Sequence, residues 1–176
     1  MIVMAGPVTF RRYQAKDHGA VAALWKRNHR EQAPAGMEEL FERHIAVTIN
    51  HELAQLPEVF SEARRNAFWV VESARAIVGS FGIESRGAGD TELRRMYLDK
   101  AYRGPGIVQR MLDHAQAEAR SLGFKKVVLR TAEIKTSAVS FYRKSGFRQV
   151  RPRIAEAVAA GEAGNGLTRF HFEKRL

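Results

Sequence analysis

The sequence contains no cysteine, which excludes disulfide bonds, thiolate zinc sites and a cysteine nucleophile. No apolar run approaches the ~20 residues that a membrane-spanning helix needs, so we expect no membrane partner. Residues 1–5 are too short and too uncharged a segment for a signal peptide. These features together are compatible with a cytoplasmic protein, and we expect that location.

Acidic residues are scarce, with 19 aspartates and glutamates against 29 lysines and arginines and a net charge of +10. Such a balance favours anionic partners such as nucleotides, nucleic acids or acidic substrates. The basic residues are nevertheless spread along the chain, with no basic run of five or more and no interleaved aromatic stripe. We therefore expect no dedicated nucleic-acid binding and keep a nucleic-acid-binding protein only as a third reading.

A chain of 176 residues suits one domain, which we place at residues 1–176. Hydrophobic periodicity predicts the order β-α-α-β-β-β-α-β-α-β-β. Residues 92–130 form a strand–helix–strand unit, which predicts parallel strands, and the hairpins before it predict antiparallel pairing. The expected fold is α/β, with a mixed, mostly antiparallel central sheet of about six or seven strands flanked by helices. We expect Asp17 to cap the first helix and Pro57 to end the second.

The turn at residues 103–108 is the most informative segment, because it follows a predicted strand and opens a predicted helix. The first N–H groups of a helix lack intrahelical partners, and the helix dipole adds positive potential there. Gly104 and Gly106 remove the Cβ atoms that would keep a phosphate away from the backbone, and Arg103 adds a fork of donors. The turn therefore predicts a site for a phosphate-bearing cofactor; the alternative is an ordinary strand-to-helix turn.

Other catalytic motifs each lack a necessary residue. His51 and Glu52 begin a zinc-protease motif, but Gln55 stands where the second histidine is needed, and we expect no metal site. Gln109 replaces the third glycine of the dinucleotide fingerprint, and Val78 replaces the first glycine of the hydrolase nucleophile elbow. No GxxxxGK phosphate loop is present. Hydrolase, kinase and dehydrogenase interpretations are thereby excluded.

Three segments, in order, resemble the GNAT superfamily of N-acetyltransferases. They are the strand at 92–98, the turn Arg103-Gly104-Pro105-Gly106, which matches the family's pyrophosphate-binding pattern, and residues 137–147, which resemble its alanine-to-GF motif. The resemblance covers about residues 67–150, roughly half of the chain. Two positions depart from the family pattern: Val108 stands where the family has a small residue, and Lys135 stands near the place of a frequent cofactor-binding asparagine.

The resemblance implies direct transfer of an acetyl group from acetyl-CoA, without a metal, to a primary amine of a small molecule or peptide. It implies that Tyr142 protonates the leaving sulfur and that Glu92 deprotonates the amine. It also implies that backbone N–H groups hold the pantetheine arm and polarise the thioester carbonyl, with Leu98 as the best single donor. The implied cofactor-binding residues are Met96, Tyr97, Leu98, Arg103, Gly104, Pro105, Gly106, Ile107, Val108 and Lys135.

Several alternatives stay open at this point. Tyr142 could instead be a core aromatic residue, and Glu92 a strand-end glutamate paired with an arginine, with water as the base. Alternation along the strand places Glu92, Arg94, Met96 and Leu98 on one face. We expect residues 28–65 and 151–169 to shape the acceptor site, and the basic balance favours an acceptor bearing a carboxylate or phosphate. A coenzyme A-binding domain with no or regulatory activity is the alternative function, and the protein is expected to be a monomer or a homodimer.

Overall fold

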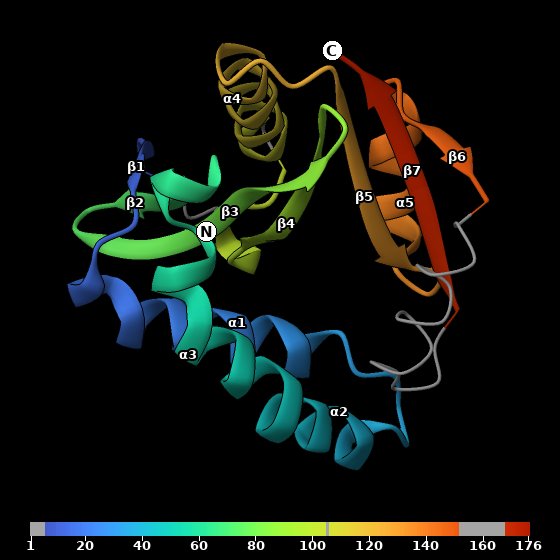
Figure 1. Cartoon of the computed structure of the whole chain (residues 1–176). Coiled ribbons are helices and arrows are strands. Elements are labelled where there is room, and N and C mark those ends of the chain that lie inside the picture. Colours follow the sequence, from blue (N-terminus) through green and yellow to red (C-terminus); the bar gives the residue numbers. More distant parts are fainter. Residues whose placement is uncertain (1–5, 105, 152–167) are drawn as a thin grey trace.

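Seven strands form one sheet in the order β1-β2-β3-β4-β5-β7-β6 (Figure 1). The computed structural model describes residues 6–104, 106–151 and 168–176. The only parallel pair in these ranges is β4 with β5, which confirms a mixed, mostly antiparallel sheet. The strands are β1 (Thr9–Arg12), β2 (Ala67–Ser73), β3 (Ala76–Gly87), β4 (Asp90–Leu98), β5 (Lys126–Ala132), β6 (Arg148–Val150) and β7 (Arg169–Arg175).

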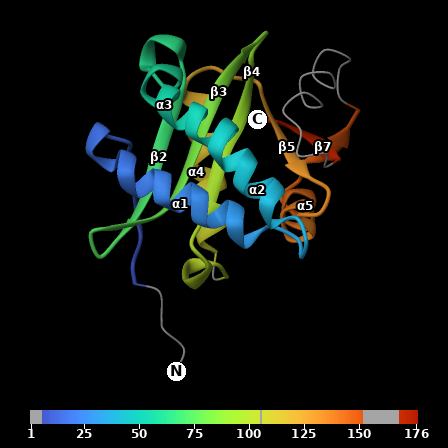
Figure 2. The ribbon, with the colours of Figure 1, turned by 90° about the horizontal axis from the view of Figure 1, so that it is seen from below.

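Helices cover both faces of the sheet. Figure 2 shows α1, α2 and α3 crossing the near face, with α4 behind the sheet. A π-helical turn at Ile45–Ile49 joins α2 and α3 into one continuous helical segment. The helices are α1 (His18–Glu31), α2 (Glu38–His44), α3 (Asn50–Val59), α4 (Ile107–Ser121) and α5 (Thr136–Lys144). The order of strands and helices is therefore the predicted one.

Two details of the helix ends differ from the predictions. Pro57 lies inside the last turn of α3, which continues to Val59, because a proline there removes a single hydrogen bond while the buried apolar face still packs on the core. Asp17 occupies the N-cap position of α1, but its carboxylate makes no bond to that helix. It accepts hydrogen bonds from the Gln14 N–H at 2.8 Å and from Arg11 at 2.8 Å, so it closes the preceding turn instead.

The sheet separates two hydrophobic cores. On the side of α1 to α3, Trp25 and Leu24 pack against Phe68 and Val70 of β2. On the side of α4, apolar residues of that helix pack against β2, β3 and β4, and Val139 of α5 joins the same core. Both faces of the sheet are thus covered, which explains the nearly continuous burial of β2.

The parallel pair β4 and β5 stays together for only part of its length. Its register runs from Asp90 opposite Lys126 to Glu92 opposite Val128, whereas β4 continues to Leu98 and β5 to Ala132. Figure 1 shows the two strands diverging toward their carboxyl ends. Backbone groups beyond Glu92 therefore lose their neighbouring strand on this side, and a gap opens in the middle of the sheet.

Candidate active site

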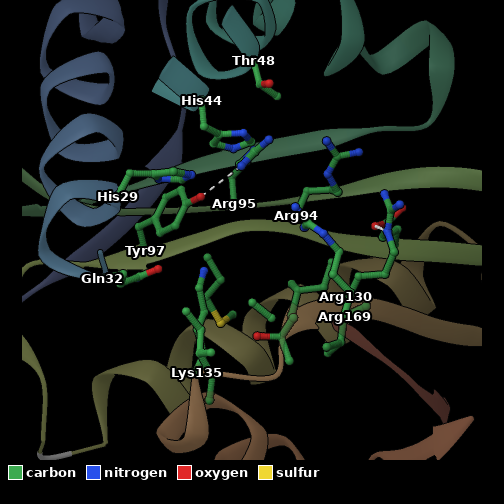
Figure 3. Close-up of a pocket in the computed structure, with 18 of the residues that line it drawn as sticks. His29, Gln32, His44, Thr48, Arg94, Arg95, Tyr97, Arg130, Lys135 and Arg169 are labelled. Carbon is green, nitrogen blue, oxygen red and sulfur yellow. Dashed lines mark hydrogen bonds and ion pairs between the residues drawn. The ribbon is translucent and has the colours of Figure 1, made fainter. Parts of the chain in front are cut away.

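A cavity of about 250 Å³ lies where β4 and β5 diverge. Its walls come from α1, α2, β4, β5, α5 and the start of β7 (Figure 3). Side chains between residues 29 and 52 line it, and these belong to the first segment expected to shape the acceptor site. Most of the second expected segment, residues 152–167, lies outside the described residues. The lining includes the two predicted catalytic residues, Glu92 and Tyr142.

A β-bulge at Arg95 shapes the wall formed by β4. Arg95 has a φ of 50°, and the register passes from Gly82 opposite Arg94 to Ser80 opposite Tyr97, so two residues face one across the ladder. The Arg95 carbonyl accepts a hydrogen bond from the Ser80 hydroxyl at 3.0 Å. The buried Trp25 indole in turn donates to that hydroxyl at 3.0 Å, so the bulge is anchored in the core.

The bulge corrects one prediction. Its extra residue reverses the alternation of β4, so Glu92 and Arg94 share a face with Tyr97 and not with Leu98. Tyr97 lies in the core beneath α1, whereas Leu98 lies in the core beneath α4. A simple alternation rule cannot detect this, because a bulge inserts one residue without changing the hydrophobic composition of the strand.

At the end of β4, the backbone N–H groups of Tyr97 and Leu98 point in opposite directions. The Asp99 N–H donates to the Val78 carbonyl at 2.8 Å, so alternation along the antiparallel ladder makes Tyr97 and Ser80 the next hydrogen-bonded pair. The N–H of Leu98 then points away from β3, toward the side where β5 has separated. This direction is the one that a donor to a ligand between the two strands requires.

The turn before α4 leaves several N–H groups open. Gly104 and Gly106 have φ values of 127° and 75°, and a Cβ atom built on either would meet nothing within 4 Å. The first α-helical bond runs from the Arg110 N–H to the Gly106 carbonyl at 3.0 Å. The N–H groups of Ile107 and Val108 precede that bond and have no partner within the helix. Pro105 lies outside the described residues, and the Val108 side chain packs against the core.

Arg103 does not present a free fork of donors. Its Nε donates to the Leu98 carbonyl at 2.8 Å, and its terminal nitrogen donates to Asn28 at 2.9 Å and Glu31 at 2.6 Å. The side chain therefore ties the turn to the end of β4 and to α1. These bonds engage two of its three guanidinium nitrogens and fix the shape of the turn.

Tyr142 combines the two readings left open by the sequence. Its ring packs near Phe147 and Phe172, at centroid distances of 5.6 and 6.3 Å, as a core aromatic does. Its hydroxyl reaches the cavity wall and donates to the Met96 sulfur at 3.8 Å. Burial, and then the nearby Tyr97, raise the pKa of Tyr142 above its ordinary value. The phenol is therefore protonated at neutral pH, as a proton donor must be.

Glu92 is buried and fully engaged by arginines. Arg130 donates to one carboxylate oxygen at 3.0 Å, and Arg86 donates to the other. Burial alone would raise the pKa of Glu92, but Arg94, Arg130 and Arg86 more than offset this and lower it. A general base near neutral pH needs the opposite change. The base role of Glu92 stays a prediction, and the arginine-paired reading describes its observed contacts.

Lys135 lies at the N-cap position of α5 and lines the cavity. Burial, followed by the charges of Arg95 and Arg169, lowers the pKa of Lys135 to about 8. Neither arginine was among the predicted site residues. Arg95 belonged to a short basic pair and Arg169 began the last predicted strand, so their positions in the sequence carried no sign of a shared cavity.

Two histidines that seemed scattered in the sequence also meet in this cavity. The rings of His29 and His44 stack at a centroid distance of 5.4 Å. Burial and the positive charge of Arg95 lower the pKa of both, that of His29 to about 3. Both rings are therefore neutral in the folded protein near pH 7.

The described residues offer neither a metal-binding group nor a membrane-spanning helix. In residues 6–104, 106–151 and 168–176, no group of three or more histidine or acidic side chains is arranged to hold a metal ion. Within the same part of the chain, no helix has the length and apolar character needed to cross a bilayer.

Comparison with known proteins links these features to one family. Residues 64–149 match the family described as "Acetyltransferase (GNAT) domain". The "Uncharacterized N-acetyltransferase YjgM" of Escherichia coli (strain K12) is 33% identical over 101 residues, which is 56% of this chain and 60% of that protein. Human "N-acetyltransferase 8B" is 26% identical over 112 residues, 61% of this chain and 49% of that protein. The chain thus spans about half to three fifths of these curated relatives.

Solved structures share the whole fold at lower identity. An acetyltransferase of the GNAT family from Staphylococcus aureus Mu50 superposes with a TM-score of 0.77 at 16% identity, over 97% of this chain and 99% of that one. The PaiA N-acetyltransferase of Thermoplasma acidophilum, solved in complex with coenzyme A, gives 0.74 at 18% identity, again over 97% and 99%. These superpositions extend the likeness of fold beyond the segment matched by sequence.

Proposed function

Because this chain belongs to the GNAT superfamily of acetyltransferases, we propose that it transfers an acetyl group from acetyl-CoA directly to a primary amine. The acceptor would be a small molecule or a peptide. The observation that supports this proposal best is the gap between β4 and β5, which brings the Tyr142 hydroxyl and the open side of the β4 backbone to one cavity. The chain would act as a single acetyltransferase domain, and cytoplasmic location and a monomeric or homodimeric state remain our expectations.

The acetyl donor would bind along the side of the gap nearest α4. The open N–H groups of Ile107 and Val108, at the positive end of the helix dipole, suit the pyrophosphate of coenzyme A. Gly104 and Gly106 leave the approach to those groups free of side chains. Arg103 would hold this turn at a fixed distance from Leu98 through its bond to the Leu98 carbonyl. The pantetheine arm would then run between β4 and β5.

The backbone of β4 would stabilise the charge that develops during transfer. Attack of a neutral amine on the thioester carbonyl places negative charge on the carbonyl oxygen. The Leu98 N–H, directed away from β3, is the donor we assign to that oxygen, with Met96 and Tyr97 forming the adjoining wall. Such a preorganised donor costs no rearrangement at the moment of reaction.

Tyr142 would supply the proton that the leaving sulfur needs. Its hydroxyl already donates to a sulfur atom, that of Met96, so its position suits a sulfur acceptor in the cavity. The raised pKa keeps the phenol protonated at neutral pH, so its proton is present when the thiolate forms beside it. Either Glu92 or water would remove the proton from the amine.

The test is release of free thiol from acetyl-CoA across a panel of amines, with the acetylated product identified by mass. Tyr142→Phe should lower kcat by about 10²–10⁴-fold while leaving acetyl-CoA affinity unchanged, because only the proton donor is lost. Tyr13→Phe, which removes a hydroxyl that contacts His18, is the matched control. Full kcat in Tyr142→Phe would restrict Tyr142 to core packing. Binding of acetyl-CoA without thiol release from any amine would favour a coenzyme A-binding domain.

A further inference from the structure

Three cationic side chains approach one cavity from different sides (Figure 3). Arg95 comes from the bulge of β4, Lys135 from the start of α5, and Arg169 from the first residue of β7. We call these three residues the cation cluster. Burial, and then the positive charges of neighbouring arginines, lowers the pKa values of Lys135 and Arg169. The cavity that holds them also contains the Tyr142 side chain assigned to proton transfer.

The acidic residues of the cavity neutralise only one member of the cluster, Arg95. The lining contains five lysines and arginines but only two carboxylates, Glu52 and Glu92. Glu92 pairs with Arg130 and Arg86, and Glu52 pairs with Arg95 and with Arg94. Within the part of the chain that the structure describes, neither Lys135 nor Arg169 has an ion pair or a side-chain hydrogen bond.

Two donors of the cluster are buried without an acceptor. The Nε atoms of Arg95 and Arg169 are inaccessible to solvent and have no hydrogen-bond partner in the described residues. A buried donor that is left unpaired costs about 1–3 kcal/mol, and more when the group is charged. Concentrating like charges adds to that cost. An anion bound beside the cluster would offset part of the repulsion between these charges.

The anion that fits here is not the phosphate end of the acetyl donor. The described residues of the turn at 103–108, assigned above to the pyrophosphate, are absent from the cavity lining. The cavity instead lies on the α1–α2 side of β4, where His29, His44 and Thr48 close it. Its volume of about 250 Å³ is at the small end for a ligand site. A small acceptor molecule is the ligand whose anionic group would reach this position.

We therefore propose that the acceptor is a small primary amine carrying an anionic group, a carboxylate or a phosphate, which the cation cluster binds. This inference rests on the proposed acetyltransferase function for its kinetic part only. Lys135 would act as a positive charge that attracts the anion. Arg95 and Arg169 would donate charge-assisted hydrogen bonds to it from the part of each guanidinium group that faces the cavity.

The same cluster would help the acceptor amine to lose its proton. Nearby positive charges disfavour an ammonium ion and lower its pKa. The Lys135 amine shows this effect in place, since burial and its two arginine neighbours lower its pKa to about 8. An acceptor amine held in the same cavity would be neutral, and so nucleophilic, in a larger fraction of molecules. Removal of the amine proton by Glu92 would then contribute less to the rate.

The first test measures binding of an anion without any acetyl transfer. Thermal unfolding is recorded with glutarate, an amine-free dicarboxylate, and with chloride at the same ionic strength. Glutarate should raise the Tm of the wild type and of Arg120→Gln, a control that removes an exposed arginine of α4. It should raise the Tm of Arg169→Gln and Lys135→Gln much less, because each has lost one member of the cluster.

The second test compares matched amines as acceptors. The pairs are glutamate with glutamine, which differ in the side-chain carboxylate, alanine with alaninamide, which differ in the α-carboxylate, and 2-aminoethyl phosphate with ethanolamine, which differ in the phosphate. In at least one pair the wild type should favour the anionic member by about 10-fold or more in kcat/KM. Arg169→Gln and Lys135→Gln should each weaken or lose that preference, whereas Arg120→Gln should keep it.

The results separate the two proposals. Equal use of both members in every pair, or an anionic preference that survives in both Arg169→Gln and Lys135→Gln, would overturn the acceptor assignment while acetyl transfer stands. If no amine releases thiol, the proposed function fails, and the glutarate measurement alone then tests whether the cation cluster binds an anion. Stabilisation lost in the cluster variants would then support the anion site, and stabilisation equal to that in chloride would refute it.

Discussion

Lowering the pH from 7.5 to 5 should destabilise this protein through His29. The His29 ring is 7% exposed, its Nδ1 lies 3.1 Å from the Trp25 carbonyl, and it stacks on His44. Burial, followed by the charges of Arg95 and Lys135, lowers the pKa of His29 from 6.5 to about 3. At pH 5 the folded protein therefore holds this imidazole in its neutral form, whereas the unfolded chain protonates it.

The sign and size of the effect follow from proton uptake. Below pH 6.5 the unfolded chain protonates His29, but the folded protein does so only near pH 3, so stability is lost as the pH falls through this window. The interval from pH 6.5 to 5 spans about one and a half pH units, and over each unit the free energy of unfolding falls by about 1.4 kcal/mol. The expected loss is roughly 2 kcal/mol, a large part of the ~5–15 kcal/mol that typically stabilises a domain.

Urea unfolding at pH 7.5, 6.5 and 5 would measure this loss. His29→Gln should lose roughly 2 kcal/mol less than the wild type over the same interval, because glutamine takes up no proton. His51→Gln removes an exposed histidine of α3 and serves as the control. Identical pH dependence in wild type and His29→Gln would refute the reasoning, as would an NMR titration in which the His29 ring protonates above pH 6.

Three further predictions concern the site. Gly106→Glu places a side chain at a φ of 75° and a negative charge at the N-terminus of α4, so calorimetry should show at least about 10-fold weaker acetyl-CoA binding; unchanged affinity would remove the turn from the cofactor site. If Glu92 is the base, Glu92→Gln should lower kcat/KM near pH 7, and the loss should shrink at higher pH. A pH–rate profile parallel to that of the wild type would assign the base role to water. Melting curves must confirm that the variant stays folded without its arginine pairs. Lys135→Met should raise the Tm at pH 7, because the folded state disfavours a charge at this position. The gain should fade between pH 8 and 10.5, where Lys135 of the folded wild type has lost its proton. A lower Tm of the variant at pH 7 would contradict the proposed charge repulsion.

Much of the architecture was predictable from the sequence because the signals are local. A strand shows itself through alternation or a short apolar run, and a helix through 3.6-residue spacing, so the order of elements and the mixed sheet followed from neighbouring residues. The turn at Gly104 and Gly106 was also recognisable, because glycine next to a helix start has a local meaning. Tyr142 was selected through an ordered family motif, and its position at the cavity wall is compatible with the role predicted for it.

The charges and faces of the site depended on contacts between distant segments. The bulge at Arg95 is held by Ser80 and Trp25 from other elements, so nothing in the β4 sequence alone announced the reversal of its faces. Arg103 seemed free to meet a phosphate until the fold brought Asn28 and Glu31 to its guanidinium group.

The cation cluster shows most clearly which properties the sequence determined and which depended on the tertiary structure. The sequence by itself determined that the chain is basic and that Arg95, Lys135 and Arg169 are charged, but their separation along the chain gave no reason to group them. Only the divergence of β4 from β5 and the return of β7 beside β5 bring the three into one cavity. Secondary structure is set mainly by residues within a few positions of each other, whereas the electrostatics of a site depend on which charges share a region that excludes water.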